Sequence, residues 1–132
     1  MGSRHLLIVI AAGIAAATAL AIAAPASGGG GDREVRVRGA CTGAATSKLK
    51  LKDENGRIEV EFEVDQNVNG RRWRVALFRN GVRVFRDIRT TRAPSGSFEV
   101  RRLMRDGSGR ERITARARAL SNGQLCTASA RW

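Results

Sequence analysis

Apolar and polar residues alternate along much of this chain with a period of two, the pattern of a β-strand that buries one face. Segment 57–65 shows it most clearly, because its even positions are all apolar and its odd positions after Arg57 are all acidic. Similar alternation predicts further strands at 34–41, 47–53, 71–79, 82–91, 97–105, 111–119 and 124–131. Nothing after residue 33 requires a helix, so the sequence predicts an all-β, antiparallel domain of seven or eight strands.

Asn-Gly dipeptides punctuate this pattern at four places: Asn55-Gly56, Asn69-Gly70, Asn80-Gly81 and Asn122-Gly123. A type I′ turn needs positive φ at both central residues, and Asn followed by Gly meets this need well. Each dipeptide therefore predicts a turn between neighbouring antiparallel strands.

Two of the strands depart from simple alternation. In 82–91, three apolar residues share a face with Arg86, a mixture that suits an edge strand where charge discourages aggregation. In 97–105, Leu103 breaks the alternation of the preceding residues, so we expect a β-bulge near Arg101-Arg102.

The short strands, the regular turns and Trp73 on a central strand resemble an immunoglobulin-like or fibronectin type III-like β-sandwich over about residues 47–132. The resemblance implies one sheet of 47–53, 57–65 and 97–105, and a second sheet of 71–79, 82–91, 111–119 and 124–131. The whole chain is also similar to small, uncharacterised secreted proteins of high-GC Gram-positive bacteria. That similarity implies a compartment rather than an activity.

The N-terminal segment has the composition of a secretory signal peptide. Arg4 and His5 precede an unbroken run of apolar or small residues at 6–24, and Ala24-Pro25-Ala26 supplies an A-x-A cleavage motif. We therefore expect a helical signal peptide at 1–26, removed on export. The alternative is an uncleaved N-terminal membrane anchor, because the same run could span a thin bilayer.

This interpretation divides the chain into three parts: the signal peptide, a glycine-rich flexible linker at 27–33 and a β-sandwich domain at 34–132. The expected location is extracellular or associated with the cell envelope. Cys41 and Cys126 are the only cysteines, and an even number in an exported protein predicts a disulfide near the two ends of the domain. Two buried free thiols are the alternative.

Charge is distributed unevenly along the chain. Residues 27–65 contain seven Lys or Arg and eight Asp or Glu, whereas residues 66–132 contain sixteen Arg and only four acidic residues. In the first part, the alternating lysines of 47–53 can face the alternating carboxylates of 57–65 across a hairpin, which predicts a self-neutralised surface. In the second part, we expect six arginines to share one unpaired face: Arg72, Arg74, Arg112, Arg116, Arg118 and Arg131.

Residues for catalysis or metal binding are scarce in the expected mature chain. The single histidine of the sequence, His5, lies in the signal segment, so the mature chain has none and a Ser-His-Asp or Cys-His nucleophile is excluded. Two distant cysteines without histidine do not make a zinc site. Alternate carboxylates on one flat strand suit ion pairs better than a calcium loop or a glycosidase pair. We expect no enzymatic activity, no cofactor and no metal.

The sequence therefore predicts a monomeric, non-catalytic binding module, whose arginines attract anionic envelope polymers or an acidic protein. A merely solubilising basic surface is the alternative for these arginines. Base-specific nucleic-acid recognition is not expected, because an aromatic stacking platform is missing.

Two other functions remain open. A row of alanines opposite Trp73 and Phe62 could form a small-ligand cleft, which would resemble the apoprotein carriers of enediyne chromophores, although those are acidic and carry two disulfides. Dense packing of large against small side chains is the simpler interpretation. The segment 90–97, which contains Arg92, could instead form the exposed loop of a protease inhibitor.

Overall fold

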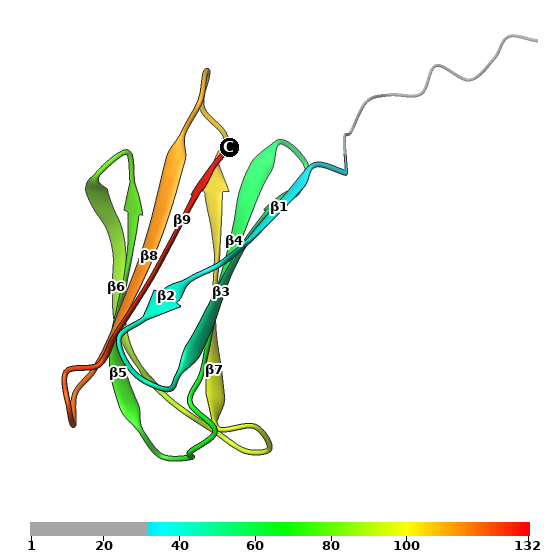
Figure 1. The fold of residues 1–132 in the computed structure, drawn as a ribbon. Helices are drawn as coiled ribbons and strands as arrows, with labels where there is room; N and C mark the ends of the chain where they lie inside the picture. Colours follow the sequence, from blue (N-terminus) through cyan, green and yellow to red (C-terminus); the bar gives the residue numbers. More distant parts are fainter. Residues whose placement is uncertain (1–31) are drawn as a thin grey trace, which may run out of the picture.

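Two antiparallel sheets face each other in the computed structural model, which describes residues 32–132 (Figure 1). The four-stranded sheet has the order β1-β3-β4-β7, with β1 (Glu34–Arg38), β3 (Thr46–Asp53), β4 (Arg57–Asp65) and β7 (Ser97–Arg105). The five-stranded sheet has the order β2-β9-β8-β5-β6, with β2 (Ala40–Cys41), β9 (Leu125–Arg131), β8 (Arg112–Ala119), β5 (Arg72–Arg79) and β6 (Val82–Thr90). The predicted all-β sandwich and its division into two sheets are confirmed.

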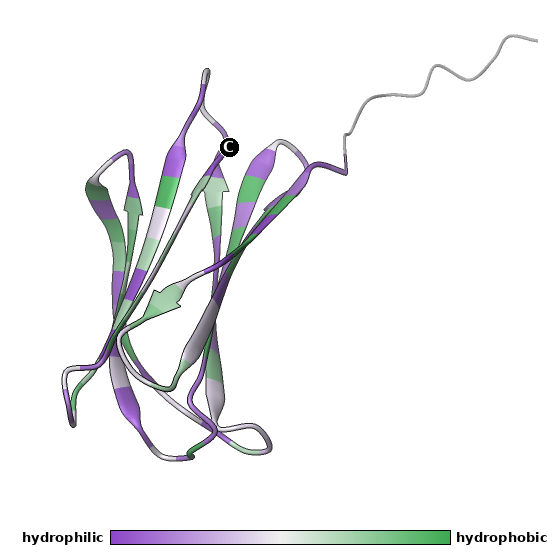
Figure 2. Cartoon of the chain, viewed as in Figure 1, coloured by the Kyte–Doolittle hydropathy of each residue, from purple (hydrophilic) through white to green (hydrophobic). Residues whose placement is uncertain are grey.

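The predicted alternation sets the core between the sheets. Leu49 and Phe62 from the four-stranded sheet, and Trp73 and Leu77 from the five-stranded sheet, are fully buried. Figure 2 shows the consequence as alternating hydrophobic and hydrophilic bands along the strands. Burial of such side chains is the main favourable term in folding, at roughly 1.5–3 kcal/mol for each large one.

The single strand predicted at 34–41 divides at Gly39 into β1 and β2, so the chain changes sheets there and the described strands number nine. The amide of Gly39 donates to the carbonyl of Ser47 over 2.9 Å. A Cβ on residue 39 would lie 2.0 Å from the Ser47 Oγ and 2.8 Å from the Thr127 carbonyl oxygen. Only glycine fits this close crossing, which the alternation pattern alone does not reveal.

Two of the four Asn-Gly dipeptides form the predicted tight hairpins. Asn55 and Gly56 have φ of 52° and 74° between β3 and β4, and Asn80 and Gly81 have φ of 50° and 83° between β5 and β6. At the other two dipeptides only the glycine has positive φ. The dipeptide at 69–70 lies in the connection from β4 to β5, which crosses between the two sheets as the predicted sheet assignment requires, so it forms a turn but no hairpin.

The bulge expected near Arg101-Arg102 is wrong. The β4–β7 register is continuous, so Arg102 lies opposite Val60 on the side of β7 that faces the other sheet. It remains exposed because β7 is an edge strand, and its guanidinium lies 4.8 Å from the centroid of the Phe85 ring. Leu103 points outward instead and is 51% exposed. A bulge does occur between β5 and β6, where the register shifts between Leu77 and Phe78. As predicted, β6 is an edge strand.

A disulfide joins Cys41 on β2 to Cys126 on β9, directly opposite each other in the five-stranded sheet, as predicted from their number and context. The bond links residues 85 positions apart in sequence. The predicted signal peptide at 1–26 and most of the linker at 27–33 lie outside the described residues. Within residues 32–132 there is no helix that could cross a membrane.

Candidate anion-binding face

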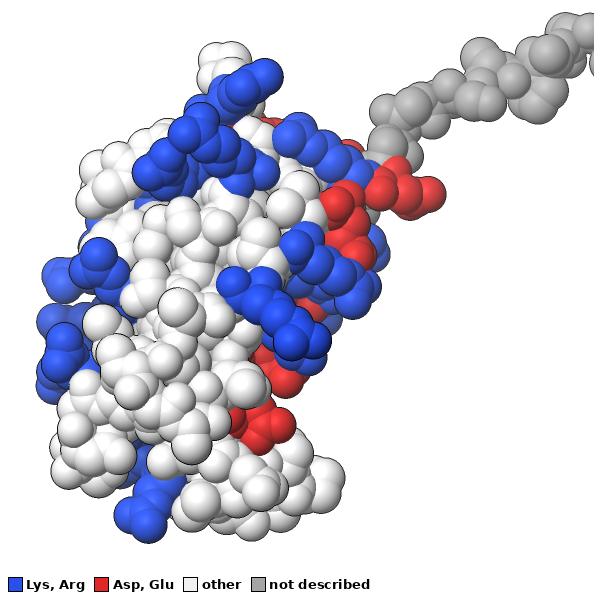
Figure 3. Space-filling model, viewed as in Figure 1, with Lys and Arg blue, Asp and Glu red and all other residues white. Residues whose placement is uncertain are grey.

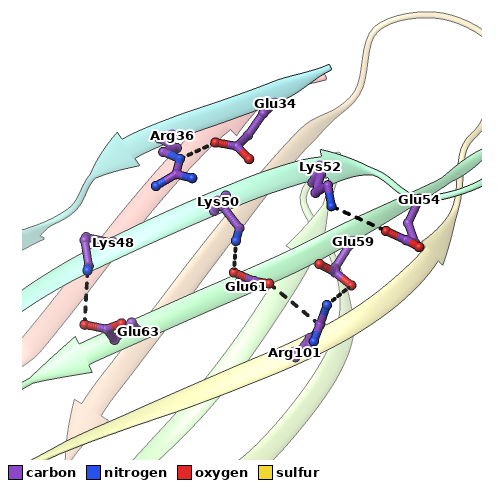
Figure 4. Close-up of polar contacts among 10 residues, drawn as sticks. All are labelled: Glu34, Arg36, Lys48, Lys50, Lys52, Glu54, Glu59, Glu61, Glu63 and Arg101. Carbon is purple, nitrogen blue, oxygen red and sulfur yellow. Dashed lines mark hydrogen bonds and ion pairs between the residues drawn. The ribbon is translucent and has the colours of Figure 1, made fainter. Parts of the chain in front are cut away.

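The outer surface of the four-stranded sheet carries charges of both signs, which neutralise each other as predicted. The register places Lys48 opposite Glu63 and Lys50 opposite Glu61. The Lys48 ammonium lies 3.3 Å from the Glu63 carboxylate, and Lys50 forms an ion pair with Glu61 (Figure 4). Opposite charges facing each other across a ladder contribute roughly 0.2–1 kcal/mol per pair.

One predicted pairing differs in detail, because β7 supplies an arginine. Lys52 lies opposite Glu59 in the register but forms its ion pair with Glu54, at 3.7 Å. Glu59 is buried and accepts a hydrogen bond from Arg101, which also lies 3.7 Å from Glu61 (Figure 4). The three glutamates of β4 are therefore engaged by basic residues of the neighbouring strands: Glu63 by β3, Glu59 by β7, and Glu61 by both.

The outer surface of the five-stranded sheet has a different composition. The six arginines predicted to share a face do so, and all are exposed: Arg72, Arg74, Arg112, Arg116, Arg118 and Arg131. Arg74 is the cross-strand partner of Arg118, and Arg112 is the partner of Arg131. The guanidinium of Arg116 lies 5.4 Å from the centroid of the Phe78 ring, an arrangement that favours a cation–π contact.

Two further arginines on β6, Arg83 and Arg86, belong to the same surface and are not among the six predicted ones. Arg86 is the partner of Ala76, and Arg83 is the partner of Phe78. Arg86 could have been assigned to this face from the sequence, because the alternation puts it on the same side of the strand as Ile88. Arg83 could not, because its side of the sheet depends on the bulge in β6. We call the outward surface formed by all eight the arginine face.

The arginine face lacks matching carboxylates. Within residues 32–132, no ion pair is formed by any of its eight arginines, whereas Arg79 pairs with the buried Glu111 and Arg89 pairs with Asp87. In the view of Figure 3, the visible acidic residues lie on the side of β1 and β3, and the flank over β5 and β6 shows only basic ones among the charged residues. The two sheets therefore present surfaces of different electrostatic character.

The described residues offer little for metal chemistry. Between residues 32 and 132, no three His, Cys, Asp or Glu side chains come together as a metal site would require. Exposed guanidinium groups, by contrast, donate hydrogen bonds in a planar fork that matches carboxylate and phosphate oxygens. What the arginine face can do chemically is bind anions.

The residues of the two alternative functions occupy ordinary structural positions. Ala115 and Ala117 are fully buried in the same core as Trp73, so large and small side chains fill the interior together. The segment that contains Arg92 connects β6 to β7, and its Gly96 packs closely against the backbone at Val68.

No protein-family model matches the chain, and no match is found among curated proteins or among solved structures. The function is therefore inferred from the geometry and charge of the arginine face itself.

Proposed function

We propose that this protein is a secreted, non-catalytic module of the cell envelope that binds anionic polymers through its arginine face. The observation that carries the proposal is the contrast between the two sheets. Five basic residues of the four-stranded sheet, Arg36, Lys48, Lys50, Lys52 and Arg101, are paired with carboxylates, whereas none of the eight arginines of the arginine face forms an ion pair within the described part of the chain. A surface of one sign attracts polyanions and raises the rate at which they associate.

We also propose that the protein is exported to the cell envelope and that its sandwich is of the immunoglobulin-like type. An export signal would place the arginine face where envelope polymers with many negative charges are present. The immunoglobulin-like type is supported by Trp73 in the core and by the two-sheet topology. The disulfide departs from that type, because it joins neighbouring strands of one sheet. The similarity to secreted proteins of high-GC Gram-positive bacteria remains part of this proposal.

A salt titration with two matched variants tests the proposal. Arg116→Gln with Arg118→Gln removes two charges from the arginine face, and Lys48→Gln with Lys50→Gln removes two from the four-stranded sheet. Affinity for a fluorescent polyanion should fall steeply with salt for the wild type. The arginine variant should bind more weakly and lose about one to two units from the slope of log K against log salt. The lysine variant should keep most of the affinity and the slope.

Circular dichroism spectra and thermal melts establish that both variants are folded before binding is compared. Equal losses in the two variants would mean that binding follows net charge rather than a face. That result, or a wild type that binds no polyanion at physiological salt, would overturn the proposed function.

A further inference from the structure

The arginine face is not uniform, because it contains a shallow hollow between β5 and β6. The hollow has a volume of about 610 Å³ and is lined by Arg74, Ala76, Arg83, Arg86, Asp87 and Ile88. Its floor is the small side chain of Ala76, and Arg86 stands directly beside that residue in the β5–β6 ladder. Arg74 lies two positions away on the same strand, so its side chain emerges on the same face.

The bulge in β6 brings the third arginine to the hollow. Residues three apart on a regular strand point to opposite faces, so Arg83 and Arg86 would be separated by the sheet if β6 were regular. Instead, Phe85 pairs with Leu77 and Arg83 pairs with Phe78, which leaves Val84 as the additional residue. Because Phe78 and Ala76 share the outward face, Arg83 and Arg86 do too. Bulges that re-aim a side chain are frequent next to functional sites.

The one carboxylate at the rim of the hollow is already engaged. An oxygen of Asp87 accepts a hydrogen bond from the Ile88 amide at 2.8 Å, and the other lies 3.1 Å from the guanidinium of Arg89. Arg89 is not among the residues that line the hollow. Asp87 is therefore balanced from outside the hollow, and the three lining guanidiniums remain available to an external anion.

We propose that this hollow is a subsite for the phosphodiester group of a polyol phosphate polymer, an inference that rests on the proposed function. Three guanidiniums around one floor suit a tetrahedral oxyanion, whose oxygens point in several directions. A planar carboxylate is satisfied by a single bidentate fork. The apolar atoms of Ala76 and of Ile88, which is 41% exposed, suit the short carbon units that flank a backbone phosphate. A sulfate ester on a sugar ring has a carbon unit on one side only, so it matches this arrangement less well than a phosphodiester, which has one on each side.

Filling the hollow without changing any charge tests the inference. Ala76→Leu puts a larger side chain on the floor, and Thr127→Leu makes a similar change in the same cross-strand row, on the far side of Arg116. Binding of the complete chain to fluorescent poly(glycerol phosphate) at physiological salt is measured by anisotropy. We expect Ala76→Leu to raise the Kd about tenfold, or about 1.4 kcal/mol. Thr127→Leu should change the Kd less than about twofold.

A second pair of variants guards against a local folding defect in Ala76→Leu. Arg86→Gln and Arg131→Gln each remove one charge from the arginine face, but only Arg86 lines the hollow. The loss should be several times larger for Arg86→Gln. Equal losses for the two arginines would overturn the subsite.

Competition with other polyanions separates this inference from the proposed function. Dextran sulfate and polyglutamate of matched charge should compete more weakly than poly(glycerol phosphate). If all three compete equally and Ala76→Leu has no effect, the arginine face binds polyanions but the subsite is wrong. If none of the three binds, the proposed function itself fails.

Discussion

At the scale of single residues, Glu61 shows how the four-stranded sheet holds its charges. Burial would raise the pKa of this carboxyl. Hydrogen bonds with Lys50 and Glu59 and the positive charges of Lys50 and Arg101 together outweigh burial, so the pKa lies below its usual 4.5. A carboxyl whose pKa is lowered on folding stabilises the protein above its unfolded-state pKa, and this contribution is lost as the pH falls through the folded-state value.

Glu61→Gln should therefore destabilise the protein at neutral pH and matter less in acid. Because the side chain is only 17% exposed, we expect a loss of about 0.5–1 kcal/mol in the free energy of unfolding at pH 7. The difference from wild type should shrink as the pH falls below the usual pKa of 4.5 and through the lower folded-state pKa, because the carboxyl is then protonated in both states. Urea denaturation at several pH values measures it.

Glu99→Gln is the control at this scale. Glu99 lies directly opposite Glu63, a pairing of like charges that is unfavourable. Its replacement should leave stability unchanged or raise it slightly at pH 7. A loss as large as that of Glu61→Gln would show that carboxylates of this sheet act through total charge rather than through their individual ion pairs.

At the scale of the elements, much of the architecture was predictable because alternation is a local property. The strands followed from their period of two, and the hairpins at 55–56 and 80–81 followed from the need for positive φ. The prediction that failed, a bulge in β7, concerned a feature that depends on contacts between residues distant in sequence. The break in alternation at Leu103 predicts a bulge, yet the register continues through Arg102, which remains exposed on the edge strand β7 with its guanidinium 4.8 Å from the centroid of the Phe85 ring.

The crossing from β1 to β2 leads to a prediction about two glycines. Gly39→Ala should lower the free energy of unfolding by about 2 kcal/mol or more, because the new Cβ would lie 2.8 Å from a backbone oxygen of β9. Gly56→Ala should cost about 1 kcal/mol, since φ is 74° there but the space around it is open. Denaturant unfolding of both variants measures the difference. A smaller loss at Gly39 than at Gly56 would mean that the two sheets are not tightly joined at the crossing.

At the scale of the whole molecule, the charge asymmetry of the sequence becomes an asymmetry between layers. The part of the chain with balanced charge supplies β1, β3 and β4, three of the four strands of one sheet. The basic part supplies most of the five-stranded sheet. It also supplies β7 of the four-stranded sheet, where Arg101 forms an ion pair with Glu59 of the balanced part. Alternation therefore predicted six of the eight arginines of the arginine face and could have given Arg86 as well, whereas Arg83 depends on the bulge in β6. The hollow was not predictable, because it depends on the same bulge, which the sequence does not mark.

The disulfide acts at this same scale, because it ties β2 near the start of the domain to β9 at its end. In the chain-entropy model, a loop of this length stabilises the fold by roughly 4–5 kcal/mol, and native strain or residual structure in the unfolded chain reduces that figure. A small domain buries a limited fraction of its surface, so such a contribution is a large part of its total stability. Reduction should therefore lower the Tm by at least about 10 °C.

The double variant Cys41→Ser with Cys126→Ser is the control for this prediction. It should melt near the reduced wild type and be insensitive to reductant. Because the bond lies in the sheet that carries the unpaired arginines, added salt should restore part of the lost stability by screening their repulsion. An unchanged Tm on reduction would show that packing between the sheets holds the domain without the covalent tie.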